Sequence, residues 1–332
     1  MIITVTPNPS LDSTVELPAS LLPGQVHRAL ASHLDPGGKG VNISRALSSA
    51  KLPTTAVIPS DADDPLLLSL STSSVPYQAV PLGSAVRTNI TITDPAGVTT
   101  KINEPGPALD PDRQQALVTA ATSVPDTTWA ALAGSLPPGT DSQFYTRLIT
   151  ALRASHPQVK IAVDSSGQAL ASTAAAQPDL ITPNAEELLE LHTLLTGGQP
   201  DITPTGLEQD PAAVVGLVHA IQQYGIRDAL VTLGAHGAVL VPAEPEARVL
   251  TGFGPPITAR STVGAGDASL AGYLAAADRG EPPAERLRHA MAHGRAAASL
   301  PGSQMPAPED LDPQIITVEP LTHQPSEGSE DL

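Results

Sequence analysis

From about residue 110 onward, short apolar or β-branched runs alternate with longer segments that have helical spacing. The expected elements are a helix at 110–123, a strand at 129–133, a helix at 141–155, strands at 159–164 and 180–182, a helix from 184, a helix at 211–224 and a strand at 229–233. Such alternation is typical of βαβ units, in which crossover helices cover both faces of a parallel sheet. The chain is therefore predicted to be an α/β protein with a central, mostly parallel sheet.

The first hundred residues add one more strand and a second, smaller group of strands. Residues 2–6 form a β-branched run that predicts a buried strand, and residues 41–50 have helical spacing. Residues 13–36 favour strands and turns, and residues 87–102 hold two β-rich pieces around a Pro- and Gly-containing turn. We expect 13–36 and 87–102 to form a small sheet outside the main domain.

The domain organisation is predicted to be simple. One domain is expected over residues 1–320, since 332 residues with 41% hydrophobic content can bury a sizeable core. The Gly- and Pro-rich stretch at 196–211 is expected to be a surface loop. The tail at 322–332 is rich in Pro, Ser, Glu and Asp, a composition typical of disorder.

Composition excludes several classes of function. Cysteine is absent, which removes disulfides, thiolate nucleophiles and cysteine-based metal sites. The net charge of −17 argues against nucleic acid or an anionic membrane as a partner. No apolar run reaches the length of a membrane span, and the first residues do not resemble a signal peptide, so a cytoplasmic location is expected.

The same negative charge makes each lysine and arginine near a motif informative. An enzyme that handles phosphorylated molecules has to overcome this field locally with particular cations. Among only 17 Lys and Arg residues, Lys39 lies inside a glycine segment and Arg87 opens a β-rich piece. Both are candidates for binding a phosphate group.

Residues 261–272 read Ser-Thr-Val-Gly-Ala-Gly-Asp-Ala-Ser-Leu-Ala-Gly, so Asp267 follows two glycines at a predicted helix start. Gly264 and Gly266 allow backbone amides to approach a phosphate closely, and amides at a helix start bind anions. An aspartate there is close enough to deprotonate a hydroxyl that attacks the phosphate. The alternative is that Asp267 only caps the helix, for which aspartate is a preferred residue.

Two further motifs also have two interpretations. Residues 37–42, Gly-Gly-Lys-Gly-Val-Asn, lack the glycine and hydroxyl positions of a Walker loop; they either hold a sugar, with Asn42 as donor and acceptor, or form an ordinary turn into a helix. Asn184 and Glu187 have the spacing of a capping box. The alternative is that Glu187 orients water on a magnesium ion, which keeps several waters and needs few protein carboxylates.

Nearly all of these motifs follow a predicted strand. The turns at 134–139, 164–167, 183–184 and 234 each follow one. In parallel sheets, ligands bind at the carboxyl ends of the strands. The motifs are thus expected to line one edge of the sheet.

Taken together, the motifs resemble the ribokinase-like sugar kinases of the PfkB family over residues 1–320. The resemblance implies that Asp267 is the catalytic base and that the backbone of Gly264, Ala265 and Gly266 forms the anion hole. It implies a magnesium-associated role for Glu187. The nucleotide-binding residues that it implies are Asn184, Thr232, Gly234 and Gly237.

Within that family the chain looks like the branch that acts on sugar phosphates. The resemblance is carried by residues 6–12, 37–42, 87–89 and 134–139. It implies that Asp12 and Asn42 bind sugar hydroxyls and that Lys39 and Arg87 hold the phosphate of the substrate. Gly38 and Ser135 complete the implied substrate-binding set.

The implied activity is ATP-dependent phosphorylation of fructose 1-phosphate to fructose 1,6-bisphosphate, with Mg²⁺. Tagatose 6-phosphate and fructose 6-phosphate are alternative substrates, and an inactive sugar-phosphate sensor is a non-enzymatic alternative. The small sheet is implied to be a lid, and the protein a homodimer. Three departures are notable. Thr182 replaces the usual lysine, Ala268 replaces the usual serine, and the usual Asn and Gly near the end, tied to a monovalent cation in some members, are replaced around Pro301-Gly302-Ser303. Potassium activation is therefore not expected.

Overall fold

The computed structural model describes residues 1–321, so the predicted disordered tail at 322–332 lies outside the described residues. Its larger sheet contains β1 (Ile2–Val5), β4 (Thr54–Pro59), β5 (Tyr77–Val80), β8 (Trp129–Ala133), β9 (Lys160–Asp164), β10 (Leu180–Ile181), β11 (Asp228–Thr232), β12 (Ala238–Val241), β13 (Leu250–Phe253) and β14 (Thr317–Pro320). Their spatial order is β14-β13-β12-β11-β10-β9-β8-β1-β4-β5. Strands from β5 to β11 pair in parallel, whereas β12, β13 and β14 extend the sheet with antiparallel pairs. The predicted mostly parallel α/β sheet is confirmed.

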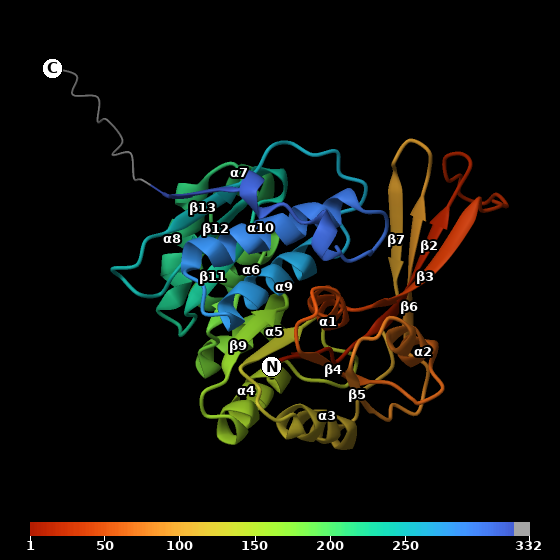
Figure 1. Ribbon diagram of the computed structural model, residues 1–332, viewed down its shortest axis with the longest axis horizontal. Coiled ribbons are helices and arrows are strands. Elements are labelled where there is room, and N and C mark those ends of the chain that lie inside the picture. The colour runs from red at the N-terminus through yellow and green to blue at the C-terminus, as the bar shows by residue number, and fades with distance from the viewer. Residues whose placement is uncertain (322–332) are drawn as a thin grey trace.

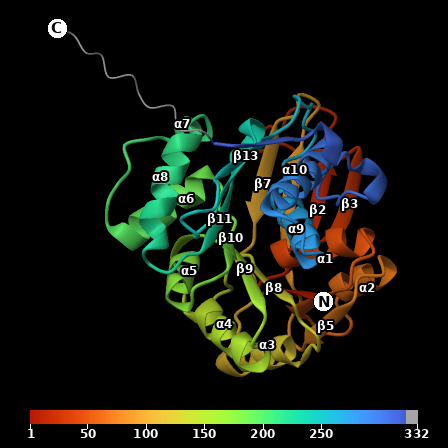
Figure 2. The ribbon, with the colours of Figure 1, turned by 60° about the vertical axis from the view of Figure 1, so that its left-hand side comes forward.

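Helices cover both faces of this sheet (Figures 1 and 2). One face carries α1 (Lys39–Ser49), α9 (Ala265–Asp278) and α10 (Pro283–Ser299). The other carries α2 (Pro65–Thr72), α3 (Pro111–Ser123), α4 (Phe144–Ser155), α5 (Gly167–Ser172), α6 (Ala185–Thr196), α7 (Pro204–Glu208) and α8 (Pro211–Gln222). Side chains alternate along each strand, so Ile2 joins the apolar cluster on the first face and Ile3 the cluster on the second.

Local sequence explains where several helices begin. Helices α2, α3, α7 and α8 each start with a proline, whose missing N–H would be unpaired at that position anyway. The residue before each proline accepts a hydrogen bond from a first-turn amide; these capping residues are Asp64, Asp110, Thr203 and Asp210. The prediction of a loop at 196–211 was wrong in part, because this cap-proline pair starts α7, which buries Leu207.

A second, four-stranded sheet lies beside the main body, at the right of Figure 1. It contains β2 (Ser10–Glu16), β3 (Ala31–Gly37), β6 (Arg87–Thr93) and β7 (Thr99–Asn103), in the order β3-β2-β6-β7. The small sheet expected from residues 13–36 and 87–102 is present.

The two faces of this small sheet differ in character. Residues that pair across strands share a face, and Asp12 pairs with both Asp35 and Asn89. The opposite face carries an apolar row, because Leu34 and Ile90 both pair with Ser13 and Ile90 pairs with Ile102. Leu34 and Ile102 are 56% and 53% exposed. The sheet thus has one polar face and one uncovered apolar face.

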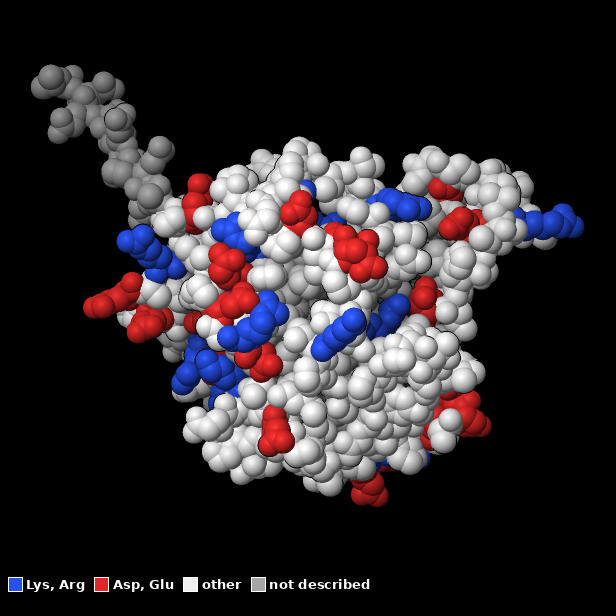
Figure 3. Space-filling model, in the orientation of Figure 1, with Lys and Arg blue, Asp and Glu red and all other residues white. Residues whose placement is uncertain are grey.

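Two observations describe the molecule as a whole. Over residues 1–321, each helix is too short or too polar to cross a lipid bilayer. On the face drawn in Figure 3, lysine and arginine side chains are interspersed with acidic ones.

Candidate active site

Asp267 lies in the first turn of α9, directly behind the glycine turn. Gly264 precedes the helix with a φ of +78°, a left-handed conformation that favours glycine over residues with a Cβ. Asp267 is only 7% exposed, and its Oδ2 accepts a hydrogen bond of 2.8 Å from the Asn42 amide. Gly266, by contrast, is exposed and has open space where a Cβ would point. The backbone of this turn is therefore free to approach a ligand.

The surroundings of Asp267 suit a proton acceptor. Burial raises the pKa of its carboxyl to about 7, helped by the nearby negative charge of Asp164 and opposed by Lys39 and the Asn42 hydrogen bond. A base whose pKa lies near neutrality is efficient at physiological pH. Asp267 therefore has the burial and the pKa of a catalytic base. Within the described part of the chain, its side chain accepts from Asn42 and from no first-turn amide.

Lys39 is the cation nearest to these carboxylates. It opens α1, and its Nζ lies 2.9 Å from Asp164 at the end of β9 and 3.6 Å from Glu187 on α6. Burial opposes its positive charge, but Asp164, Glu187 and Asp267 together raise the pKa of Lys39 well above its usual value. The lysine is thus charged and surrounded by acidic groups contributed by three elements.

The two carboxylate oxygens of Glu187 make different contacts, one that fits helix capping and one that fits a role in the site. Its backbone N–H donates to Asn184 Oδ1 at 2.9 Å and its Oε2 accepts from the Asn184 N–H at 3.0 Å, so the predicted capping box is present. Its other oxygen, Oε1, is the one beside Lys39. Burial raises the pKa of Glu187, with Lys39 acting in the opposite direction. Capping therefore uses Oε2 and leaves Oε1 directed toward Lys39 and the candidate active site.

Residues 37–42 are packed tightly against the ends of β1 and β2. Gly38 has a φ of +105°, and a Cβ on Gly40 would lie 2.4 Å from Thr6 Oγ1. A Cβ on Gly37 would overlap the Asp12 carboxylate at 2.3 Å. The glycines thus allow α1 to start close enough for Lys39 and Asn42 to reach the site.

On the polar face of the small sheet, Asp12 accepts hydrogen bonds from Ser10 Oγ at 2.8 Å and from Asn89 Nδ2 at 3.0 Å. Arg87 donates from Nη1 to the Glu104 carbonyl at 3.0 Å. Arg87 Nε and Asn89 Oδ1 are buried, yet neither has a hydrogen-bond partner within residues 1–321. Buried polar atoms in native proteins are nearly always paired. A donor and an acceptor on this face are therefore available to a ligand.

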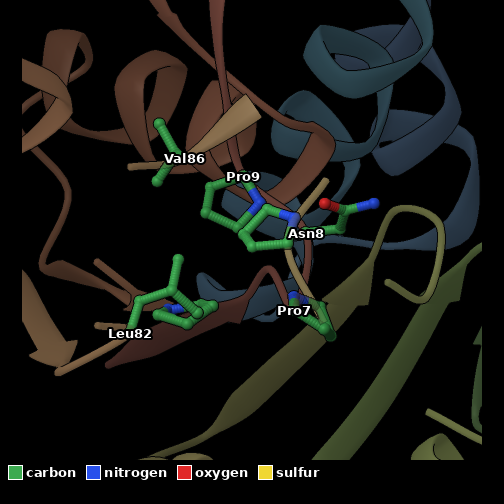
Figure 4. Close-up of a pocket in the computed structure, with 7 residues that line it drawn as sticks. Pro7, Asn8, Pro9, Leu82 and Val86 are labelled. Carbon is green, nitrogen blue, oxygen red and sulfur yellow. The ribbon is translucent and has the colours of Figure 1, made fainter. Parts of the chain in front are cut away.

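Ser135 follows β8, and its Oγ accepts a hydrogen bond of 3.3 Å from Asn8 Nδ2. Asn8 also donates to the Pro105 carbonyl at 3.1 Å. A tight pocket beside Asn8 is lined by Pro7, Asn8, Pro9, Pro59, Leu82, Val86 and Pro107. In Figure 4 the Asn8 amide points away from Leu82 and Val86. Proline fixes its own φ, so this lining restricts how the chain enters the small sheet.

The expected nucleotide turn lies further along the same sheet edge. Thr232 forms a parallel bridge with Asn184, which joins this turn to the α6 cap. Gly237 has a φ of +102°, and a Cβ there would lie 2.1 Å from the Gly252 carbonyl oxygen. Gly234 is exposed. Thr182, in the place of the usual lysine, has a buried hydroxyl that makes no hydrogen bond in the part of the chain that the structure describes.

The structure brings the motif residues together in three groups. In the first group Asn42 contacts Asp267, and Lys39 contacts Glu187 and lies near enough to Asp267 to lower its pKa. Asp12 and Arg87 lie on the polar face of the small sheet, and Asn184 connects to Thr232. Sequence reasoning assigned no role to Asp164, although it ends a predicted strand at the correct edge. It also overlooked Arg45, which lies one helical turn beyond Asn42.

A parallel α/β sheet with a buried aspartate behind a glycine turn, and with cations at the same edge, defines an enzyme class that handles phosphate groups. The chain belongs to the pfkB family of carbohydrate kinases, whose family pattern it matches over residues 6–310.

Known proteins place the chain within this family. It is 33% identical over 322 residues to a 1-phosphofructokinase of Rhodobacter capsulatus, with 96% of each chain covered. It is 29% identical over 314 residues to the ATP-dependent 6-phosphofructokinase isozyme 2 of Escherichia coli, covering 93% and 96% of the two chains. A structure of the tetrameric inhibited form of Escherichia coli phosphofructokinase-2 aligns with a TM-score of 0.79 at 28% identity, covering 91% and 95%. The ribokinase-like fold is confirmed.

Proposed function

We propose that this protein transfers a phosphoryl group from ATP to the 6-hydroxyl of fructose 1-phosphate, giving fructose 1,6-bisphosphate and ADP. The observation that carries the proposal is the buried Asp267 carboxylate behind the Gly264–Gly266 turn. Its hydrogen bond from Asn42 joins the predicted sugar segment to the predicted phosphate turn. Similarity to the 1-phosphofructokinase of Rhodobacter capsulatus over nearly the whole chain supports the choice of substrate.

In this proposal Asp267 accepts the proton of the sugar hydroxyl as that oxygen attacks the γ-phosphoryl group. The N–H groups at the start of α9 stabilise the negative charge of the transferred group. Phosphoryl transfer needs little covalent help from protein, so positioning and charge neutralisation supply most of the rate. Asp267, Asn42 and the glycine turn are the parts of the chain that do this.

The phosphate already on the sugar requires cations, and the structure offers two. Arg87 lies on the same face of the small sheet as Asp12, and its buried Nε has no hydrogen-bond partner among the described residues. Lys39 lies among carboxylates near Asp267. A sugar phosphate that bridges these two elements would hold its hydroxyl toward Asp267, with Asp12, Asn42, Gly38 and Ser135 around the sugar.

ATP and Mg²⁺ fit the other side of the site. Asn184, Thr232, Gly234 and Gly237 lie along one edge and would hold the nucleotide, and the relative in Escherichia coli is an ATP-dependent enzyme. Asp164 and Glu187 place carboxylate oxygens around a single cationic atom, Lys39 Nζ. A pair of carboxylates with substrate phosphates suits Mg²⁺, and Glu187 would hold it through water. Bound Mg²⁺ neutralises charge on the phosphates.

The small sheet is proposed to act as a lid and as the dimer interface. Its polar face carries substrate-binding residues, and closure over the sugar would exclude water and limit hydrolysis of ATP. Its apolar face, with Leu34, Ile90 and Ile102, has no covering element among the described residues. A second copy of the chain would bury that face, and the related phosphofructokinase-2 forms a tetramer. We therefore propose a homodimer joined through these sheets.

The experiment that tests the activity is an ADP-release assay with Mg²⁺ and ATP. Fructose 1-phosphate, fructose 6-phosphate and tagatose 6-phosphate are compared with a no-sugar control. We expect the highest kcat/KM with fructose 1-phosphate. A preference for fructose 6-phosphate or tagatose 6-phosphate would overturn the substrate and keep the reaction class. Binding of a sugar phosphate without any sugar-dependent ADP release would instead indicate a sensor.

A further inference from the structure

Arg45 is a partly buried arginine that contacts three separate parts of the protein. It lies on α1, three residues after Asn42, and its side chain is 13% exposed. Its Nη1 lies 3.1 Å from Asn42 Oδ1, 2.9 Å from the Pro36 carbonyl oxygen in β3, and 3.2 Å from the Ser303 carbonyl oxygen after α10. Its Nη2 lies 4.0 Å from Asp35.

The Asn42 amide lies between this guanidinium and the Asp267 carboxylate. A guanidinium only donates hydrogen bonds and a carboxylate only accepts them. The amide satisfies both neighbours in one orientation, with its oxygen toward Arg45 and its nitrogen toward Asp267. A flipped amide would face the carboxylate with its oxygen and the guanidinium with its NH₂ group. Asn42 is 4% exposed, so solvent water cannot compensate for these two lost bonds.

We propose that Arg45 is a positioning residue: it fixes the orientation of the Asn42 amide, so that the amide donates to Asp267 and holds the carboxylate in place for proton transfer. The same guanidinium joins this arrangement to strand β3 of the lid and to Ser303. The proposal rests on the proposed function, because it assigns Arg45 to the base of that reaction. Arg45 itself does not contact the reacting atoms.

This role has a measurable consequence for the acidity of Asp267. The charged groups that influence Asp267 are Asp164 on β9, Lys39 and Arg45 on α1, and Asp12 on β2. The hydrogen bond from Asn42 favours the ionised carboxylate, and so does the positive charge of Arg45. Loss of Arg45 therefore raises the pKa of Asp267. The acidic limb of the kcat/KM profile then moves to higher pH.

The decisive experiment is a double-mutant cycle on the full chain. ADP release with fructose 1-phosphate is measured against pH for wild type, Arg45→Met, Asn42→Ala and the double variant. We expect Arg45→Met to lower kcat roughly 10- to 100-fold and to move the acidic limb upward by about one pH unit. In the Asn42→Ala background the same substitution should change kcat less than about threefold, because its target is gone. The proposal would be overturned if Arg45→Met lowered kcat equally in both backgrounds. It would also be overturned if the acidic limb of the kcat/KM profile stayed at the wild-type pH in Arg45→Met.

Controls separate positioning from folding. Arg153 on α4 also donates to backbone carbonyls, those of Ala176 and Gln177, and pairs with Asp179 before β10. These contacts lie at the amino ends of the strands, away from the candidate active site. Arg153→Met should therefore leave the acidic limb of the kcat/KM profile at the same pH as in wild type. Arg45→Ala is expected to regain activity when guanidinium is added at low millimolar concentration, which an unfolded variant would not do. Absence of rescue in a folded variant counts against positioning.

Failure of the proposed function would look different. If wild type releases no ADP with any sugar phosphate, the kinase assignment fails, and Arg45 is then tested without catalysis. The carboxyl pKa of Asp267 is followed by ¹³C NMR titration in wild type and Arg45→Met. The same substitution is also measured in the Asn42→Ala background. A rise of the Asp267 pKa on Arg45→Met that is larger with Asn42 present than without it supports the proposal, and an equal rise in both backgrounds, or none, contradicts it.

Discussion

The amide nitrogen of Asn42 lies 2.8 Å from Asp267 Oδ2, although the two residues are 225 positions apart in the chain. Helices α1 and α9 pack on the same face of the main sheet, so the segment at 37–42 meets the glycine turn at 264–266 (Figure 1). This contact joins the proposed sugar site to the proposed base. Burial raises the pKa of Asp267, so the free energy of unfolding should depend on pH.

Replacing Asp267 with Asn should remove activity and stabilise the fold at high pH. The folded-state pKa of about 7 lies above the unfolded value, so wild type loses stability as the pH rises from about 4 through 7. Asn does not titrate, and its stability advantage should grow over that range to roughly 1–3 kcal/mol at pH 8. Thermal unfolding from pH 5 to 8 measures this, alongside a fall in kcat of about 100-fold or more.

Asp141→Asn is the matched control, because the Arg147 hydrogen bond lowers the pKa of that exposed carboxyl. It should show no stability gain as the pH rises. A gain of the same size in both variants would mean that burial of Asp267 is not the cause.

Replacing Glu187 with Gln should separate capping from metal binding. A glutamine still accepts the hydrogen bond from the Asn184 N–H, so the melting temperature should stay within a few degrees of wild type. One of the two negative charges beside Lys39 is lost while Asp164 remains, and the Mg²⁺ concentration for half-maximal ADP release should rise about tenfold or more. A titration of MgCl₂ at fixed ATP tests this, and an unchanged Mg²⁺ requirement would leave Glu187 as a cap alone.

Two glycines in open space give a matched pair of substitutions. A Cβ on Gly266 or on Gly216 of α8 would meet no atom within 4 Å. Alanine at Gly216 should stabilise the protein by roughly 0.5–1 kcal/mol, because an interior helical glycine is unfavourable, and should leave kcat unchanged. The Gly266→Ala variant should fold equally well but have a kcat/KM lower by about tenfold or more. The added methyl group would occupy space through which the phosphate approaches the backbone of the turn. Equal activity in the two variants would contradict the anion-hole assignment.

Charge on the apolar face of the small sheet should break the proposed dimer. Leu34→Asp and Ile102→Asp place carboxylates on a face that a second copy would otherwise bury, where an unpaired charge is strongly unfavourable. Light scattering after gel filtration should then give the monomer mass. Leu194→Asp, on α6 and 43% exposed, is the control and should keep the mass of wild type. A monomeric wild type would remove the dimer proposal.

Much of the α/β domain was predictable because its signals are local. The run at 129–133 forms β8 with the predicted bounds, and the spacing at 211–224 forms α8 over Pro211–Gln222. The antiparallel strands β12, β13 and β14 were not predicted. β12 and β13 pair with the strand just before them in the chain, whereas β14 pairs with β13 from the far end of the described chain. The cap-proline pair at Thr203 and Pro204 was overlooked because its Gly- and Pro-rich surroundings resemble a loop.

Local sequence patterns were enough to predict the class of site, because a glycine turn followed by Asp267, a lysine within glycines, and an Asn-x-x-Glu cap each carry their chemistry in nearby residues. How these parts combine depends on the folded chain. It placed Lys39 between Asp164 and Glu187, paired Asn42 with both Arg45 and Asp267, and gave the small sheet a polar and an apolar face. Such relationships depend on strand order and helix packing, which bring distant residues together, and local sequence patterns do not specify these distances.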